Sequence, residues 1–139
     1  MNVLIDTNVA LDYFLKREGY AENACRVFYK IITGDINGCL SSSVVTDIYF
    51  SVNKRQKAQA ARKVVEEVYR YLTILTVGEK TIGQALALPM EDFEDAVQIA
   101  AAKTIGINVV VTRDKHFKQS GMTVFDPEQF LEYLETVEI

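Results

Sequence analysis

Acidic side chains follow apolar runs at two distant places in this chain. Asp6 comes directly after the apolar residues 3–5, and Asp114 follows the apolar residues 109–111 with two residues between. If both runs are strands of one parallel sheet, their carboxyl ends bring the two carboxylates to the same edge, where such sheets bind ligands. The sequence therefore predicts a carboxylate site at that edge.

Further acids lie on stretches with helical spacing. Asp92 and Asp95 stand three residues apart at the start of a predicted helix over residues 93–105, so they lie on neighbouring faces of one turn. Asp47 lies within another predicted helix. Taken singly, an acid at the start of a helix or turn is suited to capping it, and Asp47 is suited to a solvated helix face.

Taken together, these acids predict a metal site. Asp6, Asp47, Asp95 and Asp114 at one sheet edge would repel one another, so either some of their pKa values are raised or a cation neutralises them. An all-oxygen ligand set without a His or Cys pattern favours Mg²⁺ or Mn²⁺ over zinc. The sole histidine, His116, is interpreted as a surface or structural residue near this edge.

The elements that must position these acids follow an alternating pattern. Short apolar or β-branched runs predict strands at 3–5, 39–40, 73–77, 109–111 and 123–125. Amphipathic spacing predicts helices over 9–15, 21–33, 57–71, 79–87 and 93–105, one capped by Ser43, and one opening at Pro127. Strands alternating with helices indicate a parallel sheet with right-handed crossovers. The 139 residues fit one α/β domain, 1–139.

Composition excludes several other classes of protein. The chain is 49% hydrophobic, which is typical of a globular domain, and its net charge of −4 disfavours binding to nucleic acid through a wholly basic surface. Cys25 and Cys39 form no zinc or disulfide pattern. No apolar run reaches the roughly 18 residues that span a bilayer, and no signal peptide is recognisable. We therefore expect a cytoplasmic protein that has no membrane partner.

Positive charge gathers in two places that could hold nucleic acid. Lys54, Arg55 and Lys57 belong to a ten-residue stretch, 54–63, with five basic residues and no acid. Arg113 and Lys115 flank Asp114. We predict that these side chains contact phosphates on either side of the carboxylate site. For the first group, a solvated helix face is the alternative.

Three segments carry a resemblance to a known family. They are residues 3–9 (VLIDTNV), 92–100 (DFEDAVQIA) and 111–117 (VTRDKHF). In order, spacing and polarity they resemble PIN-domain ribonucleases, especially the VapC-type toxins of toxin–antitoxin pairs. The resemblance implies a three-layer α/β fold, with a five-stranded parallel sheet of order 3-2-1-4-5 flanked by helices. It also implies an endoribonuclease that hydrolyses RNA phosphodiester bonds with Mg²⁺ or Mn²⁺.

The resemblance assigns the catalytic acids position by position. Asp6, Asp95 and Asp114 match the family acids that hold the metal, and Asp47 stands where relatives usually have Glu. Because Asp is shorter by one methylene, Asp47 would bind the metal directly or through water.

Supporting residues and partners come from the same resemblance. Asp92 is similar to an accessory acid found in part of the family, and Thr7, Asn8 and Thr112 would orient the carboxylates. A homodimer is implied, as is a small antitoxin protein whose tail blocks the acidic cleft.

Three alternatives remain open at this point. A phosphatase of the haloacid dehalogenase type needs a second Asp where this chain has Asn8. A receiver-like signalling domain needs a Lys and an acidic pair that are not evident here. An inactive PIN module that binds RNA or a protein partner is left open by Asp47.

Overall fold

Five strands form a single parallel sheet in the computed structural model, which describes residues 1–137. The strands are β1 (Asn2–Ile5), β2 (Asn37–Ser41), β3 (Thr73–Leu75), β4 (Val109–Val111) and β5 (Thr123–Phe125). Their order is β3-β2-β1-β4-β5, and every neighbouring pair is parallel. The predicted α/β class and the 3-2-1-4-5 order are therefore confirmed. β1 and β4 lie side by side in the middle of the sheet, with Ile5 paired to Val111.

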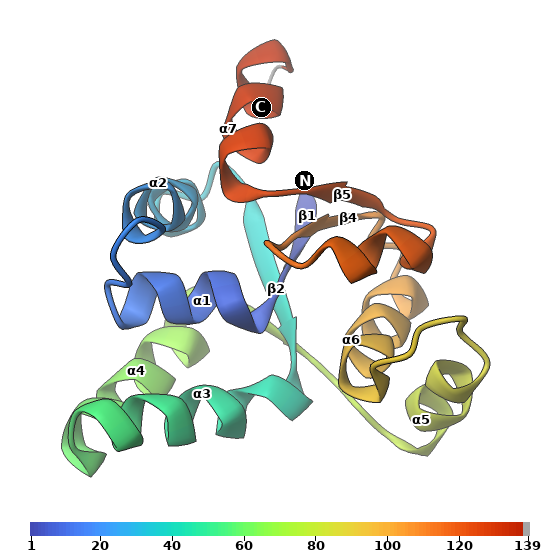
Figure 1. Cartoon of the computed structure of the whole chain (residues 1–139), viewed down its shortest axis with the longest axis horizontal. Coiled ribbons are helices and arrows are strands. Elements are labelled where there is room, and N and C mark those ends of the chain that lie inside the picture. The colour runs from blue at the N-terminus through green and yellow to red at the C-terminus, as the bar shows by residue number, and fades with distance from the viewer. Residues whose placement is uncertain (138–139) are drawn as a thin grey trace.

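Helices cover both faces of this sheet (Figure 1). They are α1 (Thr7–Phe14), α2 (Ala21–Ile32), α3 (Ser42–Arg55), α4 (Ala58–Tyr71), α5 (Glu79–Leu86), α6 (Phe93–Thr104) and α7 (Pro127–Thr136), with a 3₁₀ helix η1 (Lys115–Ser120). Helices α1 to α4 and α7 pack on one face, whereas α6 and η1 pack on the other and α5 packs against α6. The result is a helix–sheet–helix arrangement in three layers.

Successive side chains of β1 point to opposite faces of the sheet and belong to two different hydrophobic cores. Val3 and Ile5 pack with the α1–α4 layer, while Leu4 packs with Ile99 of α6 and Phe117 of η1. All five of these side chains are fully buried. Because the strand is covered on both faces, it is a continuous apolar run, and Asp6 directly after it is a buried polar residue at the end of the strand.

Some element boundaries differ from those predicted. α1 begins at Thr7 rather than at residue 9, because the Asp6 side chain caps it and accepts a hydrogen bond from the Thr7 amide. Ser43 does not cap α3: it lies inside the first turn, and Ser41 occupies the N-cap position. The hydroxyls of Ser41 and Ser43 lie 2.7 Å apart, so the two serines bond to each other.

Two expectations about the chain as a whole can be compared with the structure. Within residues 1–137, no helix is both long and apolar enough to cross a membrane. Cys39 is buried and Cys25 is partly buried, and both are free thiols.

Gly38 is a tight point in the packing of β2. An added methyl group there would lie 2.6 Å from Ile31 Cδ1 and 2.9 Å from Leu72 Cδ2, whereas one at Gly83 in α5 meets nothing within 4 Å. We expect Gly38→Ala to lower the free energy of unfolding by about 1–3 kcal/mol through overpacking. Gly83→Ala, the matched control, should raise it by roughly 0.5–1 kcal/mol. Urea denaturation measures both, and equal effects would contradict this packing.

Candidate active site

Asp6 lies at the centre of the site and is held by four hydrogen bonds. Its Oδ1 accepts from the Thr7 amide at 2.8 Å and from Gln98 Nε2 at 3.3 Å. Its Oδ2 accepts from Asn8 Nδ2 at 2.9 Å and from Thr112 Oγ1 at 2.6 Å. The structure thus places Thr7, Asn8 and Thr112 against this carboxylate, although Thr7 contributes its backbone amide rather than its hydroxyl. Four accepted bonds fill about all the lone-pair positions of a carboxylate.

Burial has the largest effect on the pKa of Asp6. The residue is only 4% exposed. Loss of solvation raises the pKa of Asp6, the bonds from Thr112, Thr7 and Gln98 lower it, and repulsion from Asp114 raises it again, so that the net shift is upward. The donors hold the carboxylate in place but do not fully replace the water it has lost.

Asp95 lies in the first turn of α6 within electrostatic range of three other carboxylates. Burial, followed by repulsion from Asp6, Asp92 and Asp114, raises the pKa of Asp95 to about 7. Asp6 and Asp95 come from positions 89 residues apart, and Asp114 follows β4. The fold therefore brings Asp6, Asp95 and Asp114 near enough to repel one another, while their role as catalytic metal ligands stays a prediction.

Asp92 and Asp114 also fulfil the ordinary role of capping. Asp92 Oδ1 accepts from the Asp95 amide at 3.0 Å at the start of α6. Asp114 Oδ1 accepts from the His116 amide at 2.9 Å and lies 2.9 Å from His116 Nδ1. Each carboxylate keeps its Oδ2 outside these caps, so capping and a role in the site are compatible.

Asp47 contacts the acid cluster at Glu94, a residue that the sequence does not mark as part of the site. Its carboxyl group shares a hydrogen bond with Glu94, and this bond, together with burial and repulsion from Asp47, Asp92 and Asp95, raises the pKa of Glu94 to about 7. Asp47 therefore lies beside Glu94 of α6, at the rim of the cluster.

Two residues of the site were not predicted, Glu94 and Gln98. Glu94 is adjacent to Asp95 within the segment 92–100, and its type and spacing there do not indicate a role in the site. Gln98 is the single polar residue in the buried run from Ala96 to Ala102. A fully buried amide on an apolar helix face needs a hydrogen-bond partner, so a lone Gln in this apolar run indicates a buried polar contact. Its Nε2 reaches Asp6, while its Oε1 is buried without a partner among residues 1–137.

The donor chemistry of the cluster fits a hard divalent cation. The carboxylates of Asp92 and Asp114 lie near Asp95 together with that of Asp6, while His116 lowers the pKa of Asp95 from the other side of the cluster. Oxygen ligands of this kind suit Mg²⁺ and Mn²⁺. In the described part of the chain, no three Asp, Glu, His or Cys side chains converge closely enough to ligate an ion as they stand. Binding a cation therefore requires side chains to rotate inward from their present positions.

Arg113 is engaged with a buried acid. Its Nε and Nη2 donate to the two carboxylate oxygens of Asp12 at 2.7 and 3.0 Å, and Asp12 is fully buried in α1. Arg17 lies 3.4 Å from the same carboxylate, and the Arg113 guanidinium stacks 3.8 Å above the Tyr20 ring. This ion pair ties α1, which follows Asp6, to the segment that carries Asp114. The phosphate contact predicted for Arg113 remains a prediction, and most of the guanidinium is already partnered.

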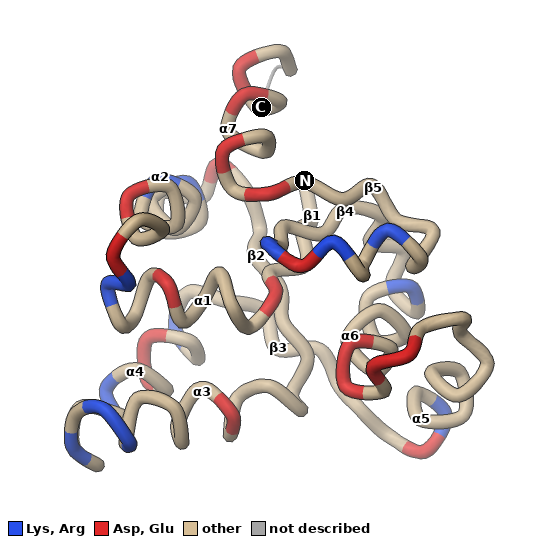
Figure 2. Tube along the Cα trace, viewed as in Figure 1, with Lys and Arg blue, Asp and Glu red and all other residues tan. Residues whose placement is uncertain are grey.

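The other basic residues predicted to contact phosphates are exposed on the surface around the acid cluster (Figure 2). Lys54, Arg55 and Lys57 are exposed at the junction of α3 and α4. Lys54 is seven residues beyond Asp47 on α3, which places it about 10 Å further along the helix axis. Lys115 is exposed at the start of η1, next to Asp114.

Fold and site together define an α/β protein with a carboxylate site at the edge of its sheet. The sequence profile of the PIN domain matches residues 2–116. The chain therefore belongs to the PIN domain family, which confirms the resemblance drawn from the three segments. It is 26% identical to ribonuclease VapC1 of Aquifex aeolicus (strain VF5), over 97% of this chain and 96% of that protein.

Solved structures share the same fold. VapC20 of Mycobacterium tuberculosis, described as a sarcin-ricin-loop-cleaving toxin, superposes with a TM-score of 0.69 at 17% identity, covering 87% of this chain and 96% of that one. VapBC2 of Rickettsia felis, solved bound to a DNA fragment from its promoter, gives a TM-score of 0.68 at 16% identity, covering 91% and 98%.

The Asp12–Arg113 pair gives a prediction about stability. Arg113→Ala leaves the buried Asp12 with Arg17 alone at 3.4 Å. We expect the free energy of unfolding to fall by about 2–3 kcal/mol, less than for a fully buried pair because the arginine is partly exposed. Lys115→Ala, an exposed control, should change it by less than about 0.5 kcal/mol. Equal values for the two variants in chemical denaturation would show that the pair does not hold these segments together.

The raised pKa of Asp95 gives a prediction about pH. Because the folded protein keeps a proton that the unfolded chain releases, the free energy of unfolding in the absence of divalent ions should fall as pH rises from the ordinary value of 3.8 to about 7, and then level off. Below this window both states are protonated, so the penalty is absent. Asp95→Asn should flatten this slope in denaturation curves recorded across the window. An unchanged slope in the variant would contradict the assignment.

Proposed function

We propose that this protein is a metal-dependent endoribonuclease, the toxin of a VapBC-type toxin–antitoxin pair. The observation that carries the proposal is the gathering of Asp6, Asp95 and Asp114 at the carboxyl edge of a PIN-domain sheet. The similarity to ribonuclease VapC1 along nearly the whole chain supports the reaction class. Hydrolysis of a phosphodiester bond by carboxylates alone would place negative charge against negative charge, so a cation is required.

Asp6, Asp95 and Asp114 would hold Mg²⁺ or Mn²⁺, with Asp47 acting directly or through water. Such an ion, when bound, activates a water molecule and stabilises negative charge on the phosphate. Asp6 must free one acceptor position to bind it. The longest of its four hydrogen bonds, 3.3 Å from Gln98 Nε2, is the one lost at least cost. Gln98 therefore holds the position of the carboxylate until a cation arrives.

The other residues of the site hold the catalytic carboxylates in place or provide a group that can exchange protons. Thr112, directly after β4, and Asn8 of α1 fix the plane of the Asp6 carboxylate. Asp92 holds the first turn of α6, and with it the backbone of Asp95. The hydrogen bond with Asp47, together with burial, raises the pKa of Glu94 to about 7, so the rim of the site carries a group that can exchange protons with solvent or substrate near neutral pH.

The RNA would be held by basic side chains outside the acid cluster. Lys115 adjoins Asp114, and Lys54, Arg55 and Lys57 lie beyond Asp47 on the other side. These positions suit phosphates that flank the cleaved bond rather than the bond itself. Arg113 contributes mainly by holding the segment of Asp114 against α1.

Partners follow from the relatives. Structures of the same fold include VapBC2 of Rickettsia felis and a toxin–antitoxin complex from Klebsiella pneumoniae, which supports an antitoxin partner for this chain. A homodimer is proposed on the family relationship, since the chain belongs to the PIN domain family. Free thiols at both cysteines support the reducing cytoplasm as the location.

An inactive PIN module that binds RNA or a protein is the second candidate. Asp47 beside Glu94, rather than against Asp6, is the observation that favours it. Cleavage and binding assays separate the two functions.

We expect the purified protein to cleave a mixed RNA pool with Mg²⁺ or Mn²⁺ and not with EDTA. Asp6→Asn should reduce the rate by about a hundredfold or more, and Thr112→Val by roughly 10–100-fold, because it removes the hydroxyl that orients Asp6. Asp35→Asn changes an exposed acid far from the cluster and should leave the rate unchanged. Gel electrophoresis of labelled RNA measures all three variants.

Two results would contradict the proposal. Equal cleavage by Asp6→Asn and the unaltered protein would place the activity elsewhere. RNA binding without metal-dependent cleavage by the unaltered protein would establish the inactive module instead.

A further inference from the structure

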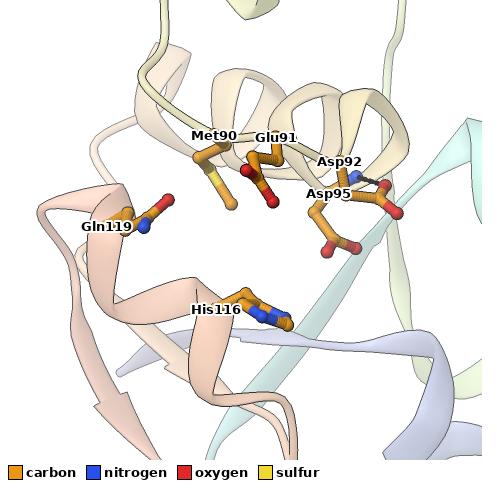
Figure 3. Close-up of a pocket in the computed structure, with 6 residues that line it drawn as sticks. All are labelled: Met90, Glu91, Asp92, Asp95, His116 and Gln119. Atoms are coloured by element: carbon orange, nitrogen blue, oxygen red, sulfur yellow. Dashed lines mark hydrogen bonds between the residues drawn. The ribbon is translucent and has the colours of Figure 1, made fainter.

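A cavity of about 290 Å³ opens beside the acid cluster, between the start of α6 and η1. Its lining consists of Met90, Glu91, Asp92, Asp95, His116 and Gln119 (Figure 3). Asp95 belongs both to this wall and to the acid cluster. The cavity and the scissile phosphate would therefore be neighbours, separated by one carboxylate.

The lining combines one thioether and one imidazole ring with acidic and amide side chains. The Met90 thioether and the His116 ring face the cavity from opposite sides, and the ends of Glu91 and Gln119 point into it (Figure 3). Among the six residues drawn, the one hydrogen bond joins Asp92 to the Asp95 amide, so Glu91 and Gln119 have no partner within the lining. Thioethers and imidazoles pack well against aromatic rings, and free carboxylate and amide groups bond to ring edges.

Charge and size restrict what can occupy the cavity. Three of the six lining residues are acids, so a phosphate group is repelled, whereas an uncharged group with hydrogen-bond donors is favoured. The volume lies at the lower end of the roughly 300–1,000 Å³ typical of small-molecule sites. That is room for a single ring system with its sugar. A nucleobase of single-stranded RNA, splayed out beside the cleaved bond, meets all of these conditions.

Resting on the proposed function, we infer that this cavity binds an unstacked guanine next to the cleaved phosphodiester bond, with Glu91 and Gln119 as its specificity-determining residues. Guanine is the one standard base whose Watson–Crick edge presents two adjacent donors, N1–H and the N2 amino group. A carboxylate accepts both at once, as Glu91 can do here. The amide of Gln119 can then donate to the guanine O6, while Met90 and His116 enclose the ring.

The first experiment observes binding without catalysis. His116 is the only histidine in the chain, so its imidazole proton signals in NMR are resolved from all others and report on this cavity and on the adjoining Asp114. We titrate the protein separately with guanosine, adenosine, cytidine and uridine. Guanosine should shift these signals at a concentration about tenfold or more below that needed for the other three, because a bidentate pair discriminates by roughly that factor. Glu91→Gln should abolish the difference, and Glu66→Gln, an exposed acid on α4, should preserve it.

The second experiment reads the base preference of cleavage. A randomised single-stranded RNA is cut in the presence of Mn²⁺, and the product ends are sequenced. The unaltered protein should enrich guanine at one fixed position next to the cut. Glu91→Gln should show that enrichment reduced about tenfold or more, and Glu66→Gln should cleave at the unaltered rate and retain the enrichment.

The outcomes separate this inference from the proposed function. Cleavage without guanine enrichment, or with the same enrichment in Glu91→Gln, overturns the guanine site and leaves the nuclease intact. Equal shifts of the His116 signals with all four nucleosides, or none with guanosine, also overturn the guanine site. Guanosine binding without any RNA cleavage supports the cavity as a base site and overturns the nuclease.

Discussion

Crowding of carboxylates at one edge of a parallel sheet is the constraint on which this structure depends. Neighbouring strands β1 and β4 end at the same edge, and α6 brings the first turn of a helix against it. The fold thus gathers acids that are far apart in sequence, and their repulsion and burial raise the pKa values of Asp6 and Asp95. Without a cation, this repulsion lowers the free energy of unfolding, and a bound cation would restore it.

The scaffold holds the acids in three different ways. Asp6 is fixed by donors that follow β1 and β4 and by Gln98 of α6. Asp92 and Asp114 are fixed as caps, and Glu94 is fixed by its hydrogen bond with Asp47. The Asp12–Arg113 ion pair ties together the two segments that follow β1 and β4. The four donors to Asp6 are uncharged, so they restrain its carboxylate without neutralising it and leave its negative charge available to a metal ion.

Much of the fold and part of the site could be predicted from the sequence. Apolar runs followed by acids identify β1 and β4 because a strand covered on both faces must be apolar throughout and a polar residue marks its end. Gln98, Glu94 and the Asp12–Arg113 pair escaped prediction because their roles depend on contacts across 92, 47 and 101 residues of sequence. Periodicity places a residue on a helix face, and it does not say which side chain meets it there.

A crystal structure grown with Mn²⁺ tests the central claim most directly, because anomalous scattering locates the ion without assumptions about its ligands. The account predicts an anomalous peak within about 2.5 Å of carboxylate oxygens of Asp6 and Asp95, with Asp114 turned toward it and the Gln98 contact to Asp6 lengthened or lost. A structure with no peak at this sheet edge, in which Asp6 still keeps all four of its hydrogen bonds, would contradict it.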